Sequence, residues 1–251
     1  MSIGETEMGN SYPHRESLRV LADKYLRAVS GDVARVFIQL VYFYLVANTL
    51  TLAEFGLFAT ASSVGIVLSR VSGFGFLSPL YRIATVKPQL IGTYTAGYLA
   101  AIAFSFPLVL LLAFGVHQFF FAGALGLTPF LLIVLSEVIF WRAIEATINI
   151  NKGLEHFGLA SVIIIFGFLI KAIAAVVLAL HAQPSIEVWA NIYIVVQALA
   201  AIITLAIFYP KQRLKFRPKL YLRRLPDAFS VSGAEVLFYL QSELDKLVVL
   251  A

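Results

Sequence analysis

The sequence contains no cysteine. That absence excludes disulfide bonds, thiolate zinc sites and cysteine nucleophiles. Charged residues are also scarce, at 13% of the 251 residues, whereas hydrophobic residues make up 60%. This apolar fraction is well above the usage of a soluble globular domain, which could not bury so much apolar surface. We therefore expect a lipid bilayer to surround most of the chain.

The motifs of common enzyme classes are missing as well. None of the four histidines stands in a metal-ligand spacing such as H-E-x-x-H, and there is no G-x-S-x-G nucleophile elbow. The connections between the long apolar runs are too short to hold an active site. We predict that the chain is not an enzyme and needs neither a metal nor another cofactor. The histidines are His14, His117, His156 and His181.

Long apolar runs dominate what is present. A hydrocarbon core of about 30 Å takes about 20 helical residues to cross, and seven runs of about that length follow one another along the chain. The alternating pattern of a membrane β-barrel is absent. The predicted fold class is therefore an all-α integral membrane protein, a polytopic bundle of seven transmembrane helices. The predicted spans are residues 33–52, 55–81, 91–114, 119–141, 157–180, 188–209 and 228–251.

Basic residues mark every second connection between these spans. The connections 51–54, 115–118 and 181–187 contain no Lys or Arg. By the positive-inside rule the N-terminus and the basic connections face the cytoplasm. The basic connections follow the second, fourth and sixth spans and contain Arg82 and Lys87, Arg142 and Lys152, and seven basic residues between 211 and 224.

This topology divides the chain into four parts. Residues 1–30 form a cytoplasmic basic tail, whose spacing of apolar residues fits an interfacial helix as well as an ordinary tail. Residues 31–210 form a six-helix transmembrane lobe, 211–227 a basic cytoplasmic linker and 228–251 a seventh transmembrane helix. The position of the linker beside a span accounts for its charge, so we predict no nucleic-acid partner.

Polar side chains inside the spans are expensive in lipid and are hypotheses for functional sites. Arg35, Gln39 and Tyr42 share one helix face in the first span, which we expect to line a bundle interior or a cavity. A position of Arg35 at the cytoplasmic interface, with its guanidinium extended toward the headgroups, fits equally well. Arg70 in the second span and Lys171 near the middle of the fifth lie deep in apolar sequence. Arg70 fits either a phosphate group or an ion pair with a neighbouring helix, and Lys171 fits either a cavity wall or a charge pair.

Acidic residues accompany these cations. Glu137 lies deep in the fourth span, and Arg142 and Glu145 have the i,i+3 spacing of an ion pair. The last span is the most polar, so it cannot face lipid on all sides. Its polar residues include Glu235, Tyr239, Gln241, Glu243, Asp245 and Lys246.

Four stretches of the chain, in their order and spacing, resemble the polysaccharide-biosynthesis exporters. These are lipid-linked oligosaccharide (O-antigen type) flippases of the multidrug/oligosaccharidyl-lipid/polysaccharide (MOP) superfamily. The resemblance covers roughly residues 30–251. The four stretches are LAEFGLF at 52–58, GFGFLSPLYR at 73–82, NKGLEHFG at 151–158 and LQSELDKLVVL at 240–250.

The resemblance implies a transporter of two six-helix lobes around a central cavity, of which this chain is the N-terminal lobe plus the first helix of the second lobe, truncated at the C-terminal side. It implies a multi-pass protein of the bacterial cytoplasmic (inner) membrane. The implied substrate is an undecaprenyl-diphosphate-linked oligosaccharide, flipped from the cytoplasmic to the outer leaflet by alternating access. The implied partners are membrane lipid, this substrate and other polysaccharide assembly proteins.

In that setting, three cations would contact the diphosphate, and four polar residues would bond to sugar hydroxyls. The acidic residues and one lysine would form charge pairs or take part in ion coupling. The cations are Arg35, Arg70 and Lys171, and the sugar contacts are Gln39, Tyr42, Tyr239 and Gln241. The candidates for charge pairing or ion coupling are Glu137, Glu235, Glu243, Asp245 and Lys246.

Further functions fit the same sequence. A different exporter of the superfamily would carry drugs or a peptidoglycan precursor. Since arginine and lysine stand beside the acids, an anionic substrate is favoured over a cationic drug. A membrane enzyme of glycan assembly and a non-transporting scaffold of such a complex are two more functions that the sequence leaves open.

Overall fold

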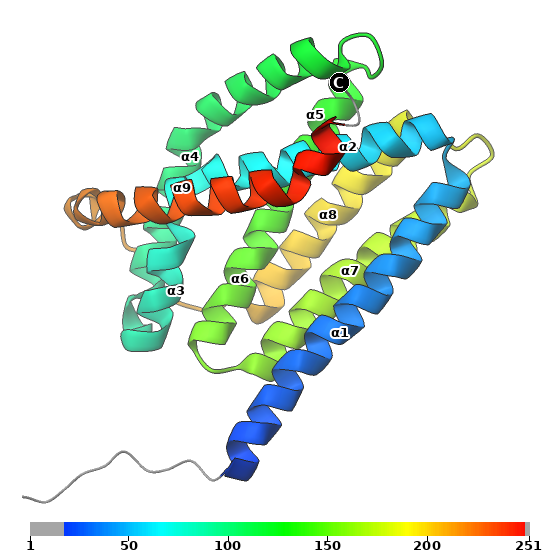
Figure 1. Cartoon of the computed structure of the whole chain (residues 1–251). Helices are drawn as coiled ribbons and strands as arrows, with labels where there is room; N and C mark the ends of the chain where they lie inside the picture. Colours follow the sequence, from blue (N-terminus) through cyan, green and yellow to red (C-terminus); the bar gives the residue numbers. More distant parts are fainter. Residues whose placement is uncertain (1–17, 249–251) are drawn as a thin grey trace, which may run out of the picture.

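The computed structural model describes residues 18–248, with side chains for 33–242, and this part of the chain is helical with no β-strand (Figure 1). The helices are α1 (Leu18–Thr49), α2 (Leu52–Val71), α3 (Leu77–Val86), α4 (Ile91–Val116), α5 (Leu127–Leu135), α6 (Arg142–Gly153), α7 (Phe157–Ala179), α8 (Ile186–Phe208) and α9 (Pro218–Val248). Short 3₁₀ turns occupy Ser72–Gly75 and Pro88–Leu90, and π-helical turns occupy His117–Phe121 and Ser136–Trp141.

Five helical stretches of the described chain are long and apolar enough to cross a membrane, and Val33–Thr49 in α1 is a shorter apolar helix. The chain is thus all-α and has the character of a multi-pass membrane protein, as the sequence predicts. Seven spans and their orientation stay predictions. The five stretches are Leu52–Gly75, Pro88–Phe121, Leu127–Gly153, Phe157–Ala179 and Ile186–Phe208.

Two predicted spans end elsewhere in the structure. The span expected at 55–81 stops at Gly75, because Gly73, Phe74 and Gly75 adopt positive φ angles of 73°, 49° and 70° that no helix continues. The span expected at 119–141 becomes Leu127–Gly153. Hydropathy ends this span before Arg142, whereas the helix continues because Arg142 pairs with Glu145 and approaches Glu235 within the protein.

The last helix also differs from its prediction. α9 begins at Pro218, inside the linker predicted at 211–227, because proline fits the first position of a helix, where no intrahelical N–H bond is needed. Only residues 209–217 between α8 and α9 are non-helical. Basic residues therefore fill the first turns of α9, which hydropathy alone does not identify as helix.

The connections gather at two ends of the bundle (Figure 1). At one end, Glu54 belongs to a capping box that starts α2, and its Oε1 also accepts a bond from the Ile186 N–H at 3.1 Å. At the other end, the Gln212 side chain contacts the backbone of Pro88 and Gly92, at 2.8 and 3.1 Å. The connection between α3 and α4 and that between α8 and α9 therefore lie at the opposite end of the bundle from the connections before α2 and before α8.

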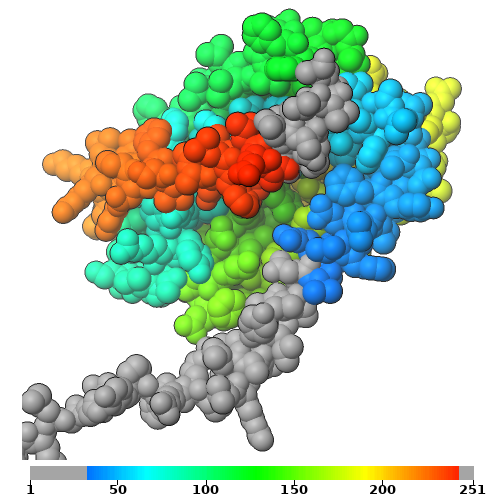
Figure 2. Space-filling model, in the orientation of Figure 1, coloured from blue at the N-terminus to red at the C-terminus, as the bar shows by residue number. Residues whose placement is uncertain are grey.

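The core and the outer surface are both apolar. Trp189, Tyr193 and Phe58 are fully buried and contact one another edge to face or tilted, while Phe104 and Phe119 are 84% and 85% exposed. Such exposure suits a lipid-facing surface rather than water. α1 packs along α7, and α9 lies on the outside of the bundle across α2 (Figure 2).

Gly75 determines how closely α9 approaches α2. A Cβ atom at Gly75 would collide with the Ala228 carbonyl oxygen and lie 2.9 Å from Ser232 Cβ. We expect Gly75→Ala to lower the free energy of unfolding by about 1–3 kcal/mol, because alanine is strained at the φ of 70° and because the added methyl group overpacks the contact. Detergent-based unfolding followed by circular dichroism measures this change. Gly56→Ala, with nothing within 4 Å of the added methyl group, is the control, and equal stability of the two variants would contradict the close approach.

Candidate functional site

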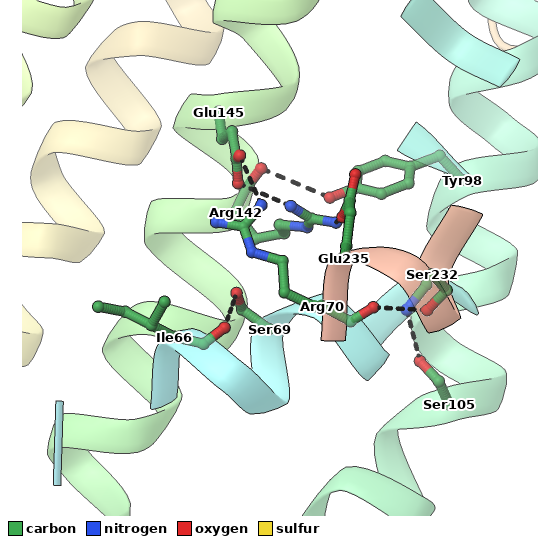
Figure 3. A network of polar contacts seen from close by, with 10 residues as sticks. Ile66, Ser69, Arg70, Tyr98, Ser105, Arg142, Glu145, Ser232 and Glu235 are labelled. Atoms are coloured by element: carbon green, nitrogen blue, oxygen red, sulfur yellow. Dashed lines mark hydrogen bonds and ion pairs between the residues drawn. The ribbon is translucent and has the colours of Figure 1, made fainter. Parts of the chain in front are cut away.

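Buried charges gather in two clusters within the bundle. The first, the four-charge network, consists of Arg70, Arg142, Glu145 and Glu235 and joins α2, α6 and α9 (Figure 3). The second, the caged-lysine cluster, consists of Lys171 and Glu137 with the side chains that surround them. Each contains equal numbers of positive and negative groups, so each is formally neutral.

Glu145 is the centre of the four-charge network. Its two carboxylate oxygens accept bonds from Arg70 Nη1 at 2.7 Å and Arg142 Nη1 at 2.8 Å (Figure 3). Arg142 is completely buried and Arg70 is 5% exposed. Burial of two guanidinium groups is tolerable only with such charge-assisted bonds. The Arg142–Glu145 pair is the one that the i,i+3 spacing predicts.

One face of α9 closes the network. Ser232, Glu235 and Tyr239 follow at steps of three and four, which aligns them on the helix. The Ser232 hydroxyl donates to the Arg70 carbonyl at 2.8 Å, and the Arg70 guanidinium lies 4.1 Å from the Tyr239 ring centre. Glu235 approaches Arg142 Nη2 at 3.6 Å. The end of α2 is therefore held by backbone and side-chain contacts to α9.

Several nitrogens of this network have no hydrogen bond. Among the described residues these are Nε of Arg70 and both Nε and Nη2 of Arg142. Glu235 Oε2 is also without one, since 3.6 Å exceeds hydrogen-bond distance. Buried polar atoms in proteins are nearly always bonded, so a free guanidinium edge calls for a partner.

A polar pocket of about 380 Å³ lies between α3, α6 and α9. Glu145 and Glu235 form part of its wall, so the pocket adjoins the four-charge network. The pocket is close to the basic connection that follows α6. Gly153, the last residue of α6, packs against Tyr81 and Ala84 of α3. The polar lining consists of Ser78, Tyr81, Glu145, Asn149, Lys152 and Glu235.

The caged-lysine cluster is separate and drier. Lys171 Nζ lies 3.3 Å from Glu137 Oε1, 4.4 Å from the Trp141 ring centre and 5.3 Å from that of Tyr193. The hydroxyl of Tyr193 donates to Glu137, and so does that of Ser62 at 3.4 Å. Carboxylate, hydroxyls and aromatic faces together replace the water that the ammonium and carboxylate have lost.

A π-helical turn brings Glu137 and Trp141 to the same lysine. Both residues lie in Ser136–Trp141, where the helix widens for one turn between α5 and α6. Such bulges occur mostly as single turns and often at functional sites. Glu137 and Trp141 are four residues apart, a spacing that also places two side chains on one face of an ordinary helix.

The candidates from the sequence are distributed over both clusters and beyond them. Arg70 and Lys171 are each paired with a glutamate, at Glu145 and Glu137, which is the ion pairing that the sequence leaves open for each cation. Tyr239 stacks against Arg70, and Glu235 is the second acid beside Arg142. Their roles toward substrate or a coupling ion stay predictions.

Four further candidates with described side chains lie elsewhere. Tyr42 is buried in the core with its ring centre 6.1 Å from that of Trp189, and Arg35 and Gln39 are partly buried on α1. Gln241 is exposed. The side chains of Glu243, Asp245 and Lys246 lie outside the described residues.

The burial of Arg142 and the place of α6 in the wall of the pocket are not predicted from the sequence. Arg142, Glu145, Asn149 and Lys152 follow at steps of three, four and three, the same face criterion that identifies Arg35, Gln39 and Tyr42. The signal is therefore present in the sequence, but hydropathy assigns Arg142 and Lys152 to a connection. No group of three or more potential metal ligands occurs within the described residues.

Comparisons of the chain with models of known families, with characterised proteins and with solved structures find no match. The chemistry of the site itself is therefore the basis for assigning a function.

Proposed function

We propose that the chain belongs to a membrane exporter that moves an undecaprenyl-diphosphate-linked saccharide from the cytoplasmic to the outer leaflet. The four-charge network beside a polar pocket carries this proposal. Ionisable groups are rare inside apolar bundles and often mark substrate paths there. A lipid-linked saccharide needs a wet passage for its headgroup, while its lipid tail remains in the bilayer.

Arg70 is the residue that would meet the diphosphate. Its Nη1 bonds to Glu145, while its Nε has no hydrogen bond. A phosphate oxygen pair fits the guanidinium fork, so an arriving diphosphate would exchange with the carboxylate. The exchange leaves Glu145 bonded to Arg142 at 2.8 Å, which keeps the acid from becoming unpaired.

A leaflet assay tests the proposal. Liposomes containing the protein and a fluorescent undecaprenyl-diphosphate saccharide are treated with a reductant that bleaches only the outer leaflet. We expect faster exposure of the inner-leaflet probe with the protein than in protein-free liposomes. Equal rates in both preparations would remove the proposed activity.

The conservative variant Arg70→Lys tests the role of the fork. It keeps the charge but cannot form two parallel bonds, and a charge-assisted bond contributes about 1.5–3 kcal/mol. We expect transport to fall by about tenfold or more. Arg224→Lys, whose side chain is 48% exposed and paired with Asp227, is the control. Transport unaffected by Arg70→Lys would take Arg70 off the path.

A further inference from the structure

The polar pocket between α3, α6 and α9 has a lining that the four-charge network does not explain. Only Glu145 and Glu235 belong to both, while Ser78, Asn149 and Lys152 contribute hydrogen-bonding groups to the pocket alone. We propose that this pocket binds a neutral polyhydroxylated ligand, the sugar part of the headgroup. The inference rests on the proposed function and specifies where the sugar is held.

The α6 wall presents three different polar groups on one face. Glu145, Asn149 and Lys152 follow at steps of four and three, so they are stacked over about 10 Å of helix at 1.5 Å per residue. The carboxylate accepts hydrogen bonds, the ammonium donates them and the amide does both. A sugar carries adjacent hydroxyls that each donate and accept, so it can bond to all three groups at once.

The α3 wall supplies the complementary surface. Tyr81 is 44% exposed and lines the pocket with the hydroxyl of Ser78. A pyranose ring has an apolar C–H face as well as a polar edge, so it can lie against an aromatic ring while its edge faces α6. The volume of about 380 Å³ lies at the lower end of the range of about 300–1,000 Å³ for small-molecule sites.

Charge disfavours the other ligand classes. An anion in the pocket would face the two carboxylates of Glu145 and Glu235 and only one ammonium, that of Lys152, whereas Arg70 and Arg142 stand outside its lining. A cation would be repelled by Lys152 and would gain little from Glu145, which is already bonded to two guanidinium groups at 2.7 and 2.8 Å. The other carboxylate, Glu235, already lies 3.6 Å from Arg142 Nη2. An apolar ligand would leave the polar wall groups unbonded, at a cost for each. A neutral ligand rich in hydroxyls avoids all three penalties.

The absence of cysteine makes the test direct. Asn149→Cys introduces a single thiol in the wall of the pocket. The purified protein in detergent is reacted with a water-soluble maleimide, alone and with three classes of probe. The first class is the neutral sugars galactose, rhamnose and N-acetylglucosamine, the second is inorganic diphosphate and the third is tetraethylammonium. Ser78→Cys on α3 is the second position, used if Asn149→Cys does not purify as a single folded species.

Asn191→Cys is the matched control. Asn191 lines a polar pocket of similar size, about 330 Å³, next to Glu187 at the end with the non-basic connections. Both variants replace an asparagine with the same thiol, so a general effect of the probes on the maleimide reaction changes both rates equally.

We expect at least one of the sugars to slow labelling of Asn149→Cys several-fold and to leave Asn191→Cys unchanged. Protection by diphosphate alone would make the pocket an anion site, and protection by tetraethylammonium alone would make it a cation site. Either result overturns the proposal. The proposal also fails if none of the probes protects the thiol, or if the thiol does not react with the maleimide.

The leaflet assay on the protein without the cysteine substitution separates this inference from the proposed function, because Asn149 itself is a proposed sugar contact. If the protein transports the lipid-linked saccharide and no sugar protects the thiol, the pocket proposal fails and the transport function remains. If sugars protect the thiol and no transport occurs, the pocket is a sugar site and the exporter proposal fails.

Discussion

Replacement of Glu145 by alanine is expected to lower the free energy of unfolding by about 3 kcal/mol, at the lower end of the usual cost of breaking a buried ion pair. The substitution removes the acceptor that bonds Arg70 at 2.7 Å and Arg142 at 2.8 Å. Glu235 cannot take over, since it reaches only Arg142 and only at 3.6 Å. Two buried cations then remain with one distant carboxylate. Water from the adjoining pocket moderates the loss, because the Glu145 side chain is 22% exposed.

Unfolding of the purified protein with a denaturing detergent, followed by circular dichroism, measures this loss. Glu187→Ala is the control, because that exposed carboxylate in the first turn of α8 contributes at most about 1 kcal/mol through the helix dipole. The quadruple variant Arg70→Met, Arg142→Met, Glu145→Leu and Glu235→Gln is expected to recover most of the stability, since it removes all four charges of the network together. If Glu145→Ala were as stable as Glu187→Ala, the guanidinium groups would not depend on Glu145 for compensation.

The helical fold could be predicted from the sequence because the apolar runs are long. The depth of Arg70 and Lys171 could be predicted for the same reason, since each stands within an apolar run. Their partners could not, because Glu145 is 75 residues from Arg70 and Glu137 is 34 residues from Lys171. Pairing over such separations depends on how helices pack, which a single sequence does not report.

A local feature of the backbone explains why the pocket could not be predicted from the sequence. Its α3 wall points toward α6 only because the backbone at Gly73, Phe74 and Gly75 takes positive φ angles and ends α2. Hydropathy continues through this break, since Phe74 and Phe76 are apolar, and so it merges two helices into one span. The glycines contribute to the family resemblance, although their pattern also predicts a sharp turn.

Lys171→Met is expected to be more damaging than Glu145→Ala, with a loss of about 4 kcal/mol in the free energy of unfolding. The side chains of Lys171 and Glu137 are only 7% and 3% exposed, and neither lines the polar pocket. Removal of the ammonium leaves Glu137 with only the hydroxyls of Tyr193 and Ser62. Because the cluster is buried away from the pocket, the remaining carboxylate bears the full penalty for an unpaired buried charge.

A double-mutant cycle distinguishes loss of the charge pair from simple loss of packing. Glu137→Gln keeps the size and shape of the glutamate, so the double variant Lys171→Met with Glu137→Gln removes both charges and little volume. We expect the double variant to be more stable than Lys171→Met, with a coupling energy near the upper end of the usual range of about 0.5–3 kcal/mol. Lys219→Met, at an exposed lysine of α9, controls for the methionine substitution and is expected to change stability by no more than about 0.5 kcal/mol. Additive losses in the cycle would mean that Lys171 is held by Trp141 and Tyr193, and that its attraction to Glu137 contributes little to the stability of the bundle.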